Sequence, residues 1–489
     1  MFDAAEIGRS TSKEEFDARI PDLRTELINT QFELRDANFP VIILLAGEDR
    51  LGCHELLGFL TQVLDSRFLH VSAFGRPSPE ESERPAFWRY WKTLPPAGRI
   101  GVFIGAWTVS AIVERLKKKT RKSEFTAQLH HAREFESTLA DEGALILKFW
   151  LHVPKSALKK QLKGAGKKNW WQPPVRASWH INKDYDRGMD LVEQAIRETS
   201  TEHAVWHVIE STDHHYRNIT TAEMILEAVR RRLDEEPHAP PTRPEAVPAE
   251  NPRTILDTVN LFADLSKEDY EPALLTEQKE LNRLSNLAFK KGVSTVMVFE
   301  GWDAAGKGGC IRRVTAAMDA TVYRVIPVAA PTDEEKAHHY LWRFWRHLPR
   351  AGHLVIFDRS WYGRVLVERV EGFASREQWT RAYSEICEFE SQLVEHGIIL
   401  LKFWLHIDRE TQLRRFQERE NTPFKQFKIT EEDYRNREKW NAYEAAVNEM
   451  VARTSTGGTP WRLVPANDKH FARIDILKTI NKALSRRIK

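Results

Sequence analysis

The chain has 489 residues, with 73 Lys and Arg against 70 Asp and Glu, so its formal net charge is only +3. This length exceeds one ordinary compact core and predicts two domains. The near balance of charge argues against a general nucleic-acid-binding surface. Three widely spaced cysteines, short apolar runs and an N-terminus without signal-peptide features predict a cytoplasmic protein, with no disulfide framework and no membrane partner.

An internal repeat relates the two halves of the chain. The apolar runs VIILLAG at 41–47 and TVMVFEG at 295–301 lie 254 positions apart (301 minus 47). The same offset carries WRYW at 88–91 onto WRFW at 342–345, and LKFWLH at 147–152 onto the same letters at 401–406. Chance does not hold one register over so many matches, so the chain is a tandem duplication.

A proline-rich segment separates the two copies, with prolines at 237, 240, 241, 244, 248 and 252. Proline lacks the backbone donor that helix and sheet interiors need, and it stiffens extended chain. We therefore predict a first domain at 1–235, a linker at 236–254 and a second domain at 255–489.

Strand and helix patterns alternate within each copy. In the second copy, apolar runs at 295–299, 322–328, 354–357, 398–407 and 461–464 alternate with charged segments of helical period such as 334–347 and 376–395. This alternation predicts two tandem three-layer α/β/α domains, each with a parallel sheet of about five strands. Ligands of such sheets bind at the carboxyl ends of the strands.

The segment GWDAAGKGG at 301–309 follows the first apolar run of the second copy. Gly-x-x-x-x-Gly-Lys between a strand and a helix is the phosphate-loop (P-loop) pattern, in which backbone N–H groups and a lysine hold an anion. The residues that we expect to contact phosphate are Lys307, Gly301, Ala304, Ala305, Gly306, Gly308 and Gly309. Gly308 stands where the pattern usually has a metal-binding Ser or Thr, so Mg²⁺ ligands must come from elsewhere.

Two aspartates are the candidate Mg²⁺ ligands. Asp303 lies inside the loop, and Asp358 follows the strand predicted at 354–357, where P-loop enzymes place a second metal contact. The alternatives are structural: an Asx turn for Asp303 and a helix N-cap for Asp358. With Lys307 and with Arg359, which follows Asp358, these aspartates form the candidate catalytic set.

The first copy lacks most of these charges. The residues at the positions of Lys307, Asp358, Arg359 and Arg364 are Cys53, Ile104, Gly105 and Ser110. Asp49, at the position of Asp303, remains. A site that stabilises a transferring phosphoryl group by charge cannot lose these groups and still work well. We therefore interpret the first copy as a catalytically inactive scaffold.

Two groups of basic residues are candidates for further phosphate binding. The first comprises Lys336, Arg343 and Arg350 at heptad spacing on one predicted helix, with Arg346 beside them. The second follows the fourth strand and comprises Arg409, Arg414, Arg415, Arg419, Lys425 and Lys428, of which Arg415 and Arg419 are the best candidates for a helical lid. In both cases the alternative is an ordinary solvated or salt-bridged helix.

Together, GWDAAGKGG at 301–309, DRSWYGRVLVERVEGF at 358–373 and LLKFWLHI at 400–407 resemble the polyphosphate kinase 2 family. The duplicated chain, with the charged motifs only in its second copy, is similar to the two-domain branch of that family. This resemblance implies a P-loop fold with a helical lid and transfer of a phosphoryl group from inorganic polyphosphate to AMP, giving ADP, with Mg²⁺. The sequence leaves open a homo-oligomer.

The resemblance also implies roles for individual residues. Lys307 and the loop amides would hold the phosphoryl group, Asp303 and Asp358 would bind Mg²⁺, and Arg359 and Arg364 would bind phosphate. Glu368 falls in the VER segment of the motif, without an assigned role, and Gly363 stands where many relatives have Asn. Three alternatives remain: an ATP-dependent nucleoside or nucleotide kinase, polyphosphate-dependent phosphorylation of ADP or GDP, and a non-catalytic phosphate sensor.

Overall fold

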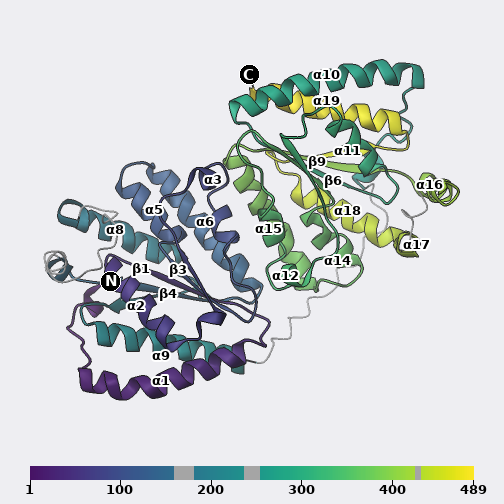
Figure 1. The fold of residues 1–489 in the computed structure, drawn as a ribbon. Coiled ribbons are helices and arrows are strands. Elements are labelled where there is room, and N and C mark those ends of the chain that lie inside the picture. Colours follow the sequence, from purple (N-terminus) through teal and green to yellow (C-terminus); the bar gives the residue numbers. More distant parts are fainter. Residues whose placement is uncertain (159–180, 236–253, 424–430, 489) are drawn as a thin grey trace. The chain divides into compact units, whose positions relative to one another are not determined.

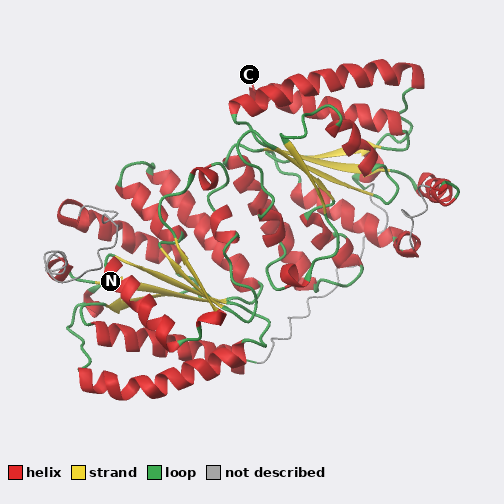
Figure 2. Cartoon of the chain, viewed as in Figure 1, coloured by secondary structure: helices red, strands yellow, loops and turns green. Residues whose placement is uncertain are grey.

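The computed structural model describes residues 1–158, 181–235, 254–423 and 431–488. Its two five-stranded parallel sheets, each flanked by helices (Figure 1 and Figure 2), confirm the predicted fold class. No helix in the described ranges is long and apolar enough to cross a membrane.

The chain divides into two compact units. The first comprises Met1–Pro77, Arg89–Ala239 and Asp333–His339, and the second comprises Ser78–Trp88, Pro240–Thr332 and Tyr340–Lys489. The predicted linker lies outside the described residues except for Thr254, so the domain limits at 235 and 255 stay a prediction.

The first copy of the repeat supplies the first sheet. Its strands are β1 (Val41–Gly47), β2 (Leu69–Ala73), β3 (Ile100–Ile104), β4 (Leu145–His152) and β5 (Trp206–Glu210). Its longer helices are α1 (Lys13–Leu34), α2 (Arg50–Val63), α5 (Trp107–Leu116), α6 (Lys122–Asp141), α8 (Ile181–Thr199) and α9 (His214–Asp234). The short elements are η1 (Asp3–Ala5), η2 (Ser66–Phe68), α3 (Pro79–Ser82) and α4 (Trp88–Trp91).

The second copy repeats this order. Its strands are β6 (Thr295–Gly301), β7 (Tyr323–Pro327), β8 (Leu354–Asp358), β9 (Ile399–His406) and β10 (Trp461–Pro465). Its longer helices are α10 (Lys267–Lys291), α11 (Lys307–Thr315), α15 (Arg376–Glu395), α16 (Arg409–Glu420), α17 (Glu431–Glu438), α18 (Trp440–Thr454) and α19 (Lys469–Ile488). The short elements are η3 (Leu256–Thr258), α12 (Asp333–Lys336), α13 (Trp342–Trp345), η4 (Trp361–Val365) and α14 (Val367–Val370).

Both sheets have the same strand order, β2-β3-β1-β4-β5 and, in the same sense, β7-β8-β6-β9-β10. The central strands β1 and β6 are buried along nearly their whole length, which explains why they are apolar without alternation. The connection after β6 runs toward the edge strand β7, whereas the connection after β8 crosses past β6 to β9. The carboxyl end of β6 is therefore the switch point at which open α/β sheets bind ligands.

Helices cover both faces of each sheet (Figure 1). In the first copy α1, α2 and α9 pack together on one face, and α5, α6 and α8 pack on the other. The core beneath α1, α2 and α9 includes Ile43, Leu56 and Ile225, all fully buried. In the second copy α10, α11 and α19 form one layer, while α14, α15 and α18 belong to the other.

Buried polar contacts repeat between the copies. In the first copy Lys148 Nζ donates to Glu136 Oε2, and in the second Lys402 Nζ donates to Glu390 Oε2, both at 2.7 Å. Trp206 and Trp461 each donate from Nε1 to a threonine hydroxyl at 2.9 Å. A buried ion pair without its partner is costly, so these residues are retained in both copies for the fold.

The helix predicted at 334–347 is wrong. The chain forms two short helices there, α12 and α13, so Lys336, Arg343 and Arg350 do not share one helical face. The run Tyr340–Trp345 is buried at every residue except Arg343. One amphipathic helix buries a single stripe, whereas this run buries side chains in several directions, and tertiary packing decides its conformation. The second predicted helix, 376–395, is confirmed as α15.

Candidate active site

The two copies differ where their central strands end. After β6 the chain forms the loop Trp302–Gly306, and α11 begins only at Lys307. After β1 the helix α2 begins already at Arg50, which is equivalent to position 304. Asp49 caps that helix by accepting a hydrogen bond from the N–H of Gly52 at 2.9 Å. The first copy therefore has no room for an open phosphate loop.

The glycine that ends each central strand serves the fold. Gly301 and Gly47 have φ of 149° and 151°. A Cβ on Gly301 would lie 2.6 Å from the carbonyl oxygen of Leu405, and one on Gly47 would lie 2.3 Å from that of Leu151. Because the copy without a phosphate loop has the same requirement, Gly301 is needed for close strand packing. From the sequence alone, Gly301 is interpreted only as a phosphate-binding residue.

The remaining loop has the geometry of an anion cradle. Ala304 and Gly306 both have positive φ, of 62° and 110°, which turns successive backbone N–H groups toward one side. Apart from the adjacent residues and the backbone of α11 itself, no atom of the described residues lies within 4 Å of where a Cβ would stand on Gly306 or Gly308. The loop is thus shaped for a ligand to approach its backbone closely.

Lys307 is the first residue of α11 and folds back over the loop. Its Nζ donates to the carbonyl oxygens of Gly301, at 2.6 Å, and Trp302, at 3.2 Å. Burial lowers the pKa of Lys307, and the negative charge of Asp303 opposes that shift. An ammonium group held by carbonyl dipoles can exchange them for phosphate oxygens without leaving the site.

The four candidate catalytic residues lie together. Arg359 Nη2 donates to Asp303 Oδ1 at 3.2 Å, which links the end of β8 to the loop after β6. Asp358, the half-buried last residue of β8, and Arg359 both interact electrostatically with Lys307. The backbone N–H of Arg359 donates to the carbonyl of Phe299 at 3.0 Å. Two adjacent parallel strands therefore deliver these side chains to one edge of the sheet.

Arg415, predicted to be a lid arginine, lies buried against the phosphate loop. Its guanidinium is buried and donates to four backbone carbonyls, those of Ala304 and Ala305 in the loop and those of Ala466 and Asn467 after β10. Burial lowers its pKa to about 10. With these bonds made to carbonyls, Arg415 braces the loop. That it also binds phosphate directly stays a prediction.

Arg343 also makes a contact that the fold itself requires. Its Nη2 donates to the carbonyl of Ala329 at 3.1 Å, and the equivalent Arg89 donates to that of Gly75 at 3.2 Å. Since the first copy retains this bond, it holds the chain after the second strand in both copies. Arg346 is exposed and stacks its guanidinium on Trp342, 4.3 Å from the ring centroid.

The remaining predicted residues form separate contacts. Arg364 pairs with Glu368 at 3.3 Å and lies over the ring of Tyr340. Glu368 has an equivalent in the first copy, Glu114, so it does not distinguish the two copies. Arg419 is half-buried on α16, in the region predicted as the lid. Lys425 and Lys428 lie outside the described residues.

Comparisons with known proteins decide the family. Residues 10–237 and 264–489 both match the sequence pattern of polyphosphate kinase 2. The chain belongs to the polyphosphate kinase 2 family. As a member of this family it contains two copies of the family's domain, in agreement with the resemblance inferred from its motifs.

Known proteins resemble this polyphosphate kinase 2 chain over its full length or over about half of it. A polyphosphate:AMP phosphotransferase of Pseudomonas aeruginosa is 46% identical over 494 residues, covering 99% of this chain and 98% of the relative. A crystal structure described as a polyphosphate kinase 2 from Pseudomonas aeruginosa superposes with a TM-score of 0.90 at 44% identity, covering 100% of this chain and 99% of that one. An ADP-polyphosphate phosphotransferase of Rhizobium meliloti is 41% identical over 45% of this chain and 72% of its own.

One pair of residues in this polyphosphate kinase 2 site was missed by sequence reasoning. Glu300 precedes the loop, is buried, and accepts a hydrogen bond from Ser360 Oγ at 2.8 Å. Burial raises the pKa of Glu300, and the charge of Lys307 opposes this shift. The equivalent residues of the first copy are Ala46 and Ala106, both buried. A search for positions that are polar in one copy and alanine in the other would have found this pair.

In the first copy, the residues at the position of the phosphate loop make contacts within their own domain. Asp49 is buried and accepts a hydrogen bond from Ser211 Oγ at 2.6 Å, and Arg217 Nη1 lies 3.7 Å from its carboxylate. Burial raises the pKa of Asp49 and also that of the Cys53 thiol. A carboxylate held in this way is an Asx-type cap and offers little to a metal ion.

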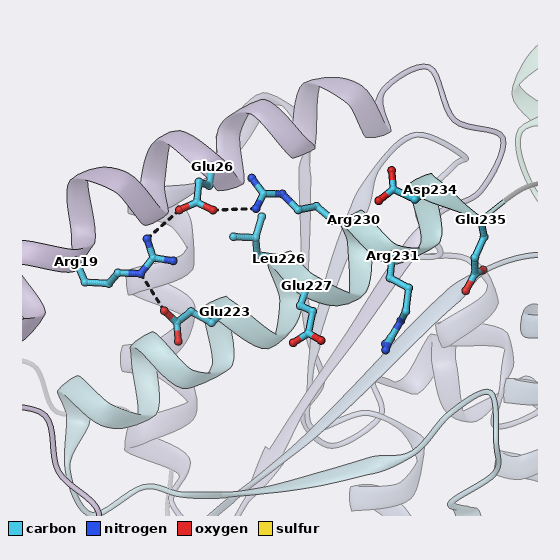
Figure 3. A pocket seen from close by; sticks show the side chains of 9 residues that line it. All are labelled: Arg19, Glu26, Glu223, Leu226, Glu227, Arg230, Arg231, Asp234 and Glu235. Atoms are coloured by element: carbon cyan, nitrogen blue, oxygen red, sulfur yellow. Dashed lines mark hydrogen bonds and ion pairs between the residues drawn. The ribbon is translucent and has the colours of Figure 1, made fainter.

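A groove between α1 and α9 is a further concavity of this polyphosphate kinase 2 chain (Figure 3). Arg19 bridges Glu26 and Glu223, and Arg230 also pairs with Glu26. Figure 3 shows these side chains engaged with one another across the groove. Its three arginines are outnumbered by five carboxylates, so the groove does not suit a phosphate ligand.

Proposed function

We propose that this chain transfers a phosphoryl group from inorganic polyphosphate to AMP, forming ADP, at the carboxyl edge of its second sheet. The observation that carries the proposal is the intact set of Lys307, Asp303, Asp358 and Arg359 in a chain that aligns end to end with a polyphosphate:AMP phosphotransferase. The second sheet supplies the loop and the charges, whereas the first sheet has neither.

The chemistry needs positioning and charge more than proton transfer. A phosphate oxygen of AMP is already ionised near neutral pH, so no general base has to activate it. Lys307 and the loop N–H groups would neutralise the transferring phosphoryl group, and Arg359 would stabilise charge that spreads over its equatorial oxygens. Arg359 also orients Asp303 by their contact, which couples phosphate binding to the proposed metal ligand.

The donor set fits Mg²⁺. Asp303 and Asp358 are carboxylates at neighbouring strand ends, and both interact electrostatically with Lys307. Among the described residues no group of three or more His, Cys, Asp and Glu side chains could enclose a metal ion. Mg²⁺ does not need such a group, because it usually keeps several waters and binds through one or two carboxylates together with substrate phosphates. Asp303 and Asp358 would hold the ion, whose positive charge would offset that of the substrate phosphates.

We further propose that the first copy is catalytically inactive. Its central strand leads directly into α2, its Asp49 is used as a helix cap, and Cys53 replaces the lysine. A phosphoryl group at this position would find a helix N-terminus already capped by Asp49 and a neutral thiol in place of an ammonium group.

One assay tests the function. The purified full chain is given AMP, Mg²⁺ and polyphosphate, with no nucleoside triphosphate, and ADP is measured. We expect ADP to form in proportion to polyphosphate consumed. Failure to form ADP, together with turnover when ATP replaces polyphosphate, would overturn the proposal in favour of an ordinary ATP-dependent kinase. The same assay with ADP or GDP as acceptor measures the preference for AMP.

A further inference from the structure

The first copy carries a cluster of cations at the edge of its sheet where catalytic charges have been lost. Arg50 begins α2, Arg76 follows β2, and Lys117, Lys118 and Lys119 follow α5. Arg76 and the three lysines are exposed, whereas Arg50 is half-buried. We call these five residues the N-terminal cationic cluster.

Electrostatic interactions join the members of the N-terminal cationic cluster. Burial lowers the pKa of Lys117, and the positive charges of Arg76, Lys119 and Arg50 lower it further. Arg50 also interacts with His54 one turn along α2. Like charges gathered at one place repel one another, so such a cluster is typical of a surface that binds an anion.

The acidic residues nearest to Arg50 in sequence are engaged by other partners. Glu48 contacts His152, and it also accepts a hydrogen bond from Trp150 Nε1 at 2.7 Å. Asp49 and Glu55 both pair with Arg217, at 3.7 Å and 3.0 Å. The carboxylates of segment 48–55 are therefore already held by buried groups.

The cluster is a property of the first copy alone. The equivalents of Arg50, Arg76, Lys117, Lys118 and Lys119 in the second copy are Ala304, Ala330, Glu371, Gly372 and Phe373. Glu371 accepts hydrogen bonds from Lys439 Nζ at 2.7 Å and from Tyr443 at 3.3 Å. Tyr443 interacts electrostatically with Asp303 and Arg359. Position 371, and hence position 117 in the first copy, therefore belongs to the ligand-binding edge of its sheet.

Lys118 adds an independent sign of function. Its φ is 56°, in the left-handed region, and its equivalent Gly372 has φ of 75°. A lysine in this conformation carries strain that glycine avoids, and strained positions concentrate at functional sites. The first copy has thus kept a cation at a position where the backbone favours glycine.

We propose that the N-terminal cationic cluster is a non-catalytic binding site for the phosphate chain of inorganic polyphosphate. The inference rests on the proposed function, which makes this polyanion a substrate. A chain with about one charge per phosphate unit matches a row of exposed cations, and no phosphate loop is needed for holding without transfer. The cluster would retain long polyphosphate on the enzyme while the second copy uses its end.

The test is a binding measurement on the full chain carrying Lys307→Ala, so that turnover does not consume the ligand. The cluster variant Arg76→Glu/Lys117→Glu/Lys119→Glu is compared with a matched control, Lys13→Glu/Arg24→Glu/Arg187→Glu. The control changes the same net charge at exposed residues on or next to α1 and on α8. We expect the cluster variant to bind long-chain polyphosphate about tenfold or more weakly, and the control to lose less than about threefold.

Two results would overturn the site. One is equal polyphosphate binding by the cluster variant and the control variant. The other is displacement of the cluster-dependent binding by AMP or ADP, which would assign the cluster to nucleotide phosphates. In the active protein, the same cluster substitutions should raise the KM for long chains several-fold more than the KM for tripolyphosphate. If the unsubstituted protein forms no ADP from polyphosphate, the proposed function is refuted. The binding comparison does not depend on ADP formation, so it tests the N-terminal cationic cluster separately.

Discussion

Arg359 and Gly105 occupy equivalent positions in the two copies and share one backbone conformation, with φ of 65° and 68°. In this left-handed region a side chain costs roughly 1–2 kcal/mol, which glycine avoids. The second copy nevertheless has an arginine there, and its guanidinium reaches Asp303 of the phosphate loop. The fold favours glycine at this position, so the arginine is present for the chemistry of the site.

Replacement of Arg359 by glycine should therefore separate stability from activity. Relief of backbone strain is partly offset by the greater freedom of glycine in the unfolded chain, so we expect Arg359→Gly to stabilise the protein by up to about 1 kcal/mol. Turnover should fall by about 100-fold or more, because a charge aimed at the transferring group is lost. Chemical denaturation and the ADP assay measure the two effects. A destabilised Arg359→Gly variant would contradict the strain argument, and Arg359→Lys is the charge-preserving control.

The lysine of the loop provides the sharpest contrast between the copies. Lys307→Ala should reduce turnover by about 1000-fold with an unchanged thermal unfolding midpoint, because the hydrogen bonds of its Nζ go to the nearby backbone carbonyls of Gly301 and Trp302. Cys53→Ala, at the equivalent position, should leave turnover within a few-fold, since that thiol is buried in the core under α2. A large loss of turnover in Cys53→Ala, with the fold intact, would refute the inactive role of the first copy.

Arg415 connects the loop to the turn after β10, so we expect its replacement to lower activity even when the positive charge is kept. Lysine keeps the charge but cannot span carbonyls on both the loop and the turn after β10. We expect Arg415→Lys to lower kcat about tenfold or more, through a misplaced loop, with a smaller effect on the KM for AMP. Arg283→Lys, at an exposed position of α10, is the matched control. Equal kcat values for Arg415→Lys and the unsubstituted protein would show that the brace is dispensable.

His406 makes the second copy sensitive to acid. Burial lowers its pKa to about 4, and its Nδ1 accepts a hydrogen bond from Trp302 Nε1 at 3.1 Å. A depressed folded-state pKa means that this stability is present above the unfolded value near 6.5 and is lost as pH falls from there toward 4. The loss amounts to about 3 kcal/mol for the whole shift. Protonation also breaks the bond to Trp302, a loop residue, so activity should fall with stability.

His406→Asn tests this dependence, because asparagine can accept the same hydrogen bond without titrating near pH 6. Its free energy of unfolding should change less between pH 6.5 and pH 4 than that of the unsubstituted protein. The equivalent His152 has the opposite shift: burial lowers its pKa, but Glu48 and Glu6 together raise it above the usual value. Its contribution is present at low pH and is lost as pH rises through that raised pKa, so His152→Asn should not reproduce the effect of His406→Asn.

Lys118 offers a counterpart to Arg359 in the first copy. Lys118→Gly should stabilise the chain by up to about 1 kcal/mol, for the same backbone reason. It should also weaken retention of long-chain polyphosphate, because a cation of the N-terminal cationic cluster is removed. Denaturation and binding to long-chain polyphosphate measure the two changes. If Lys118→Gly is more stable but binds long-chain polyphosphate as tightly as the unsubstituted protein, Lys118 does not contribute to the binding site.

Much of the architecture could be predicted because it depends on local pattern and on repetition. The strands predicted at 295–299 and 354–357 correspond to β6 and β8, since buried parallel strands are apolar over their whole length. The run predicted at 461–464 corresponds to β10, an edge strand that is only partly buried. The loop pattern predicted a helix after the loop, and α11 follows there, beginning at Lys307. The helix predicted at 334–347 failed because its apolar side chains are buried in several directions, which no helical period encodes.

The sequence by itself determined the duplication, the fold class, the family and the copy that keeps its charges, because each is written in residue identity and spacing. Only the tertiary structure decided what individual residues touch. Hydrogen bonds over more than a hundred positions placed Arg415 on the carbonyls of the loop. Backbone geometry assigned Gly301 to strand packing and revealed the strain at Arg359 and Lys118. Contacts and torsions of this kind arise when distant segments meet in the folded chain, and a linear pattern does not specify them.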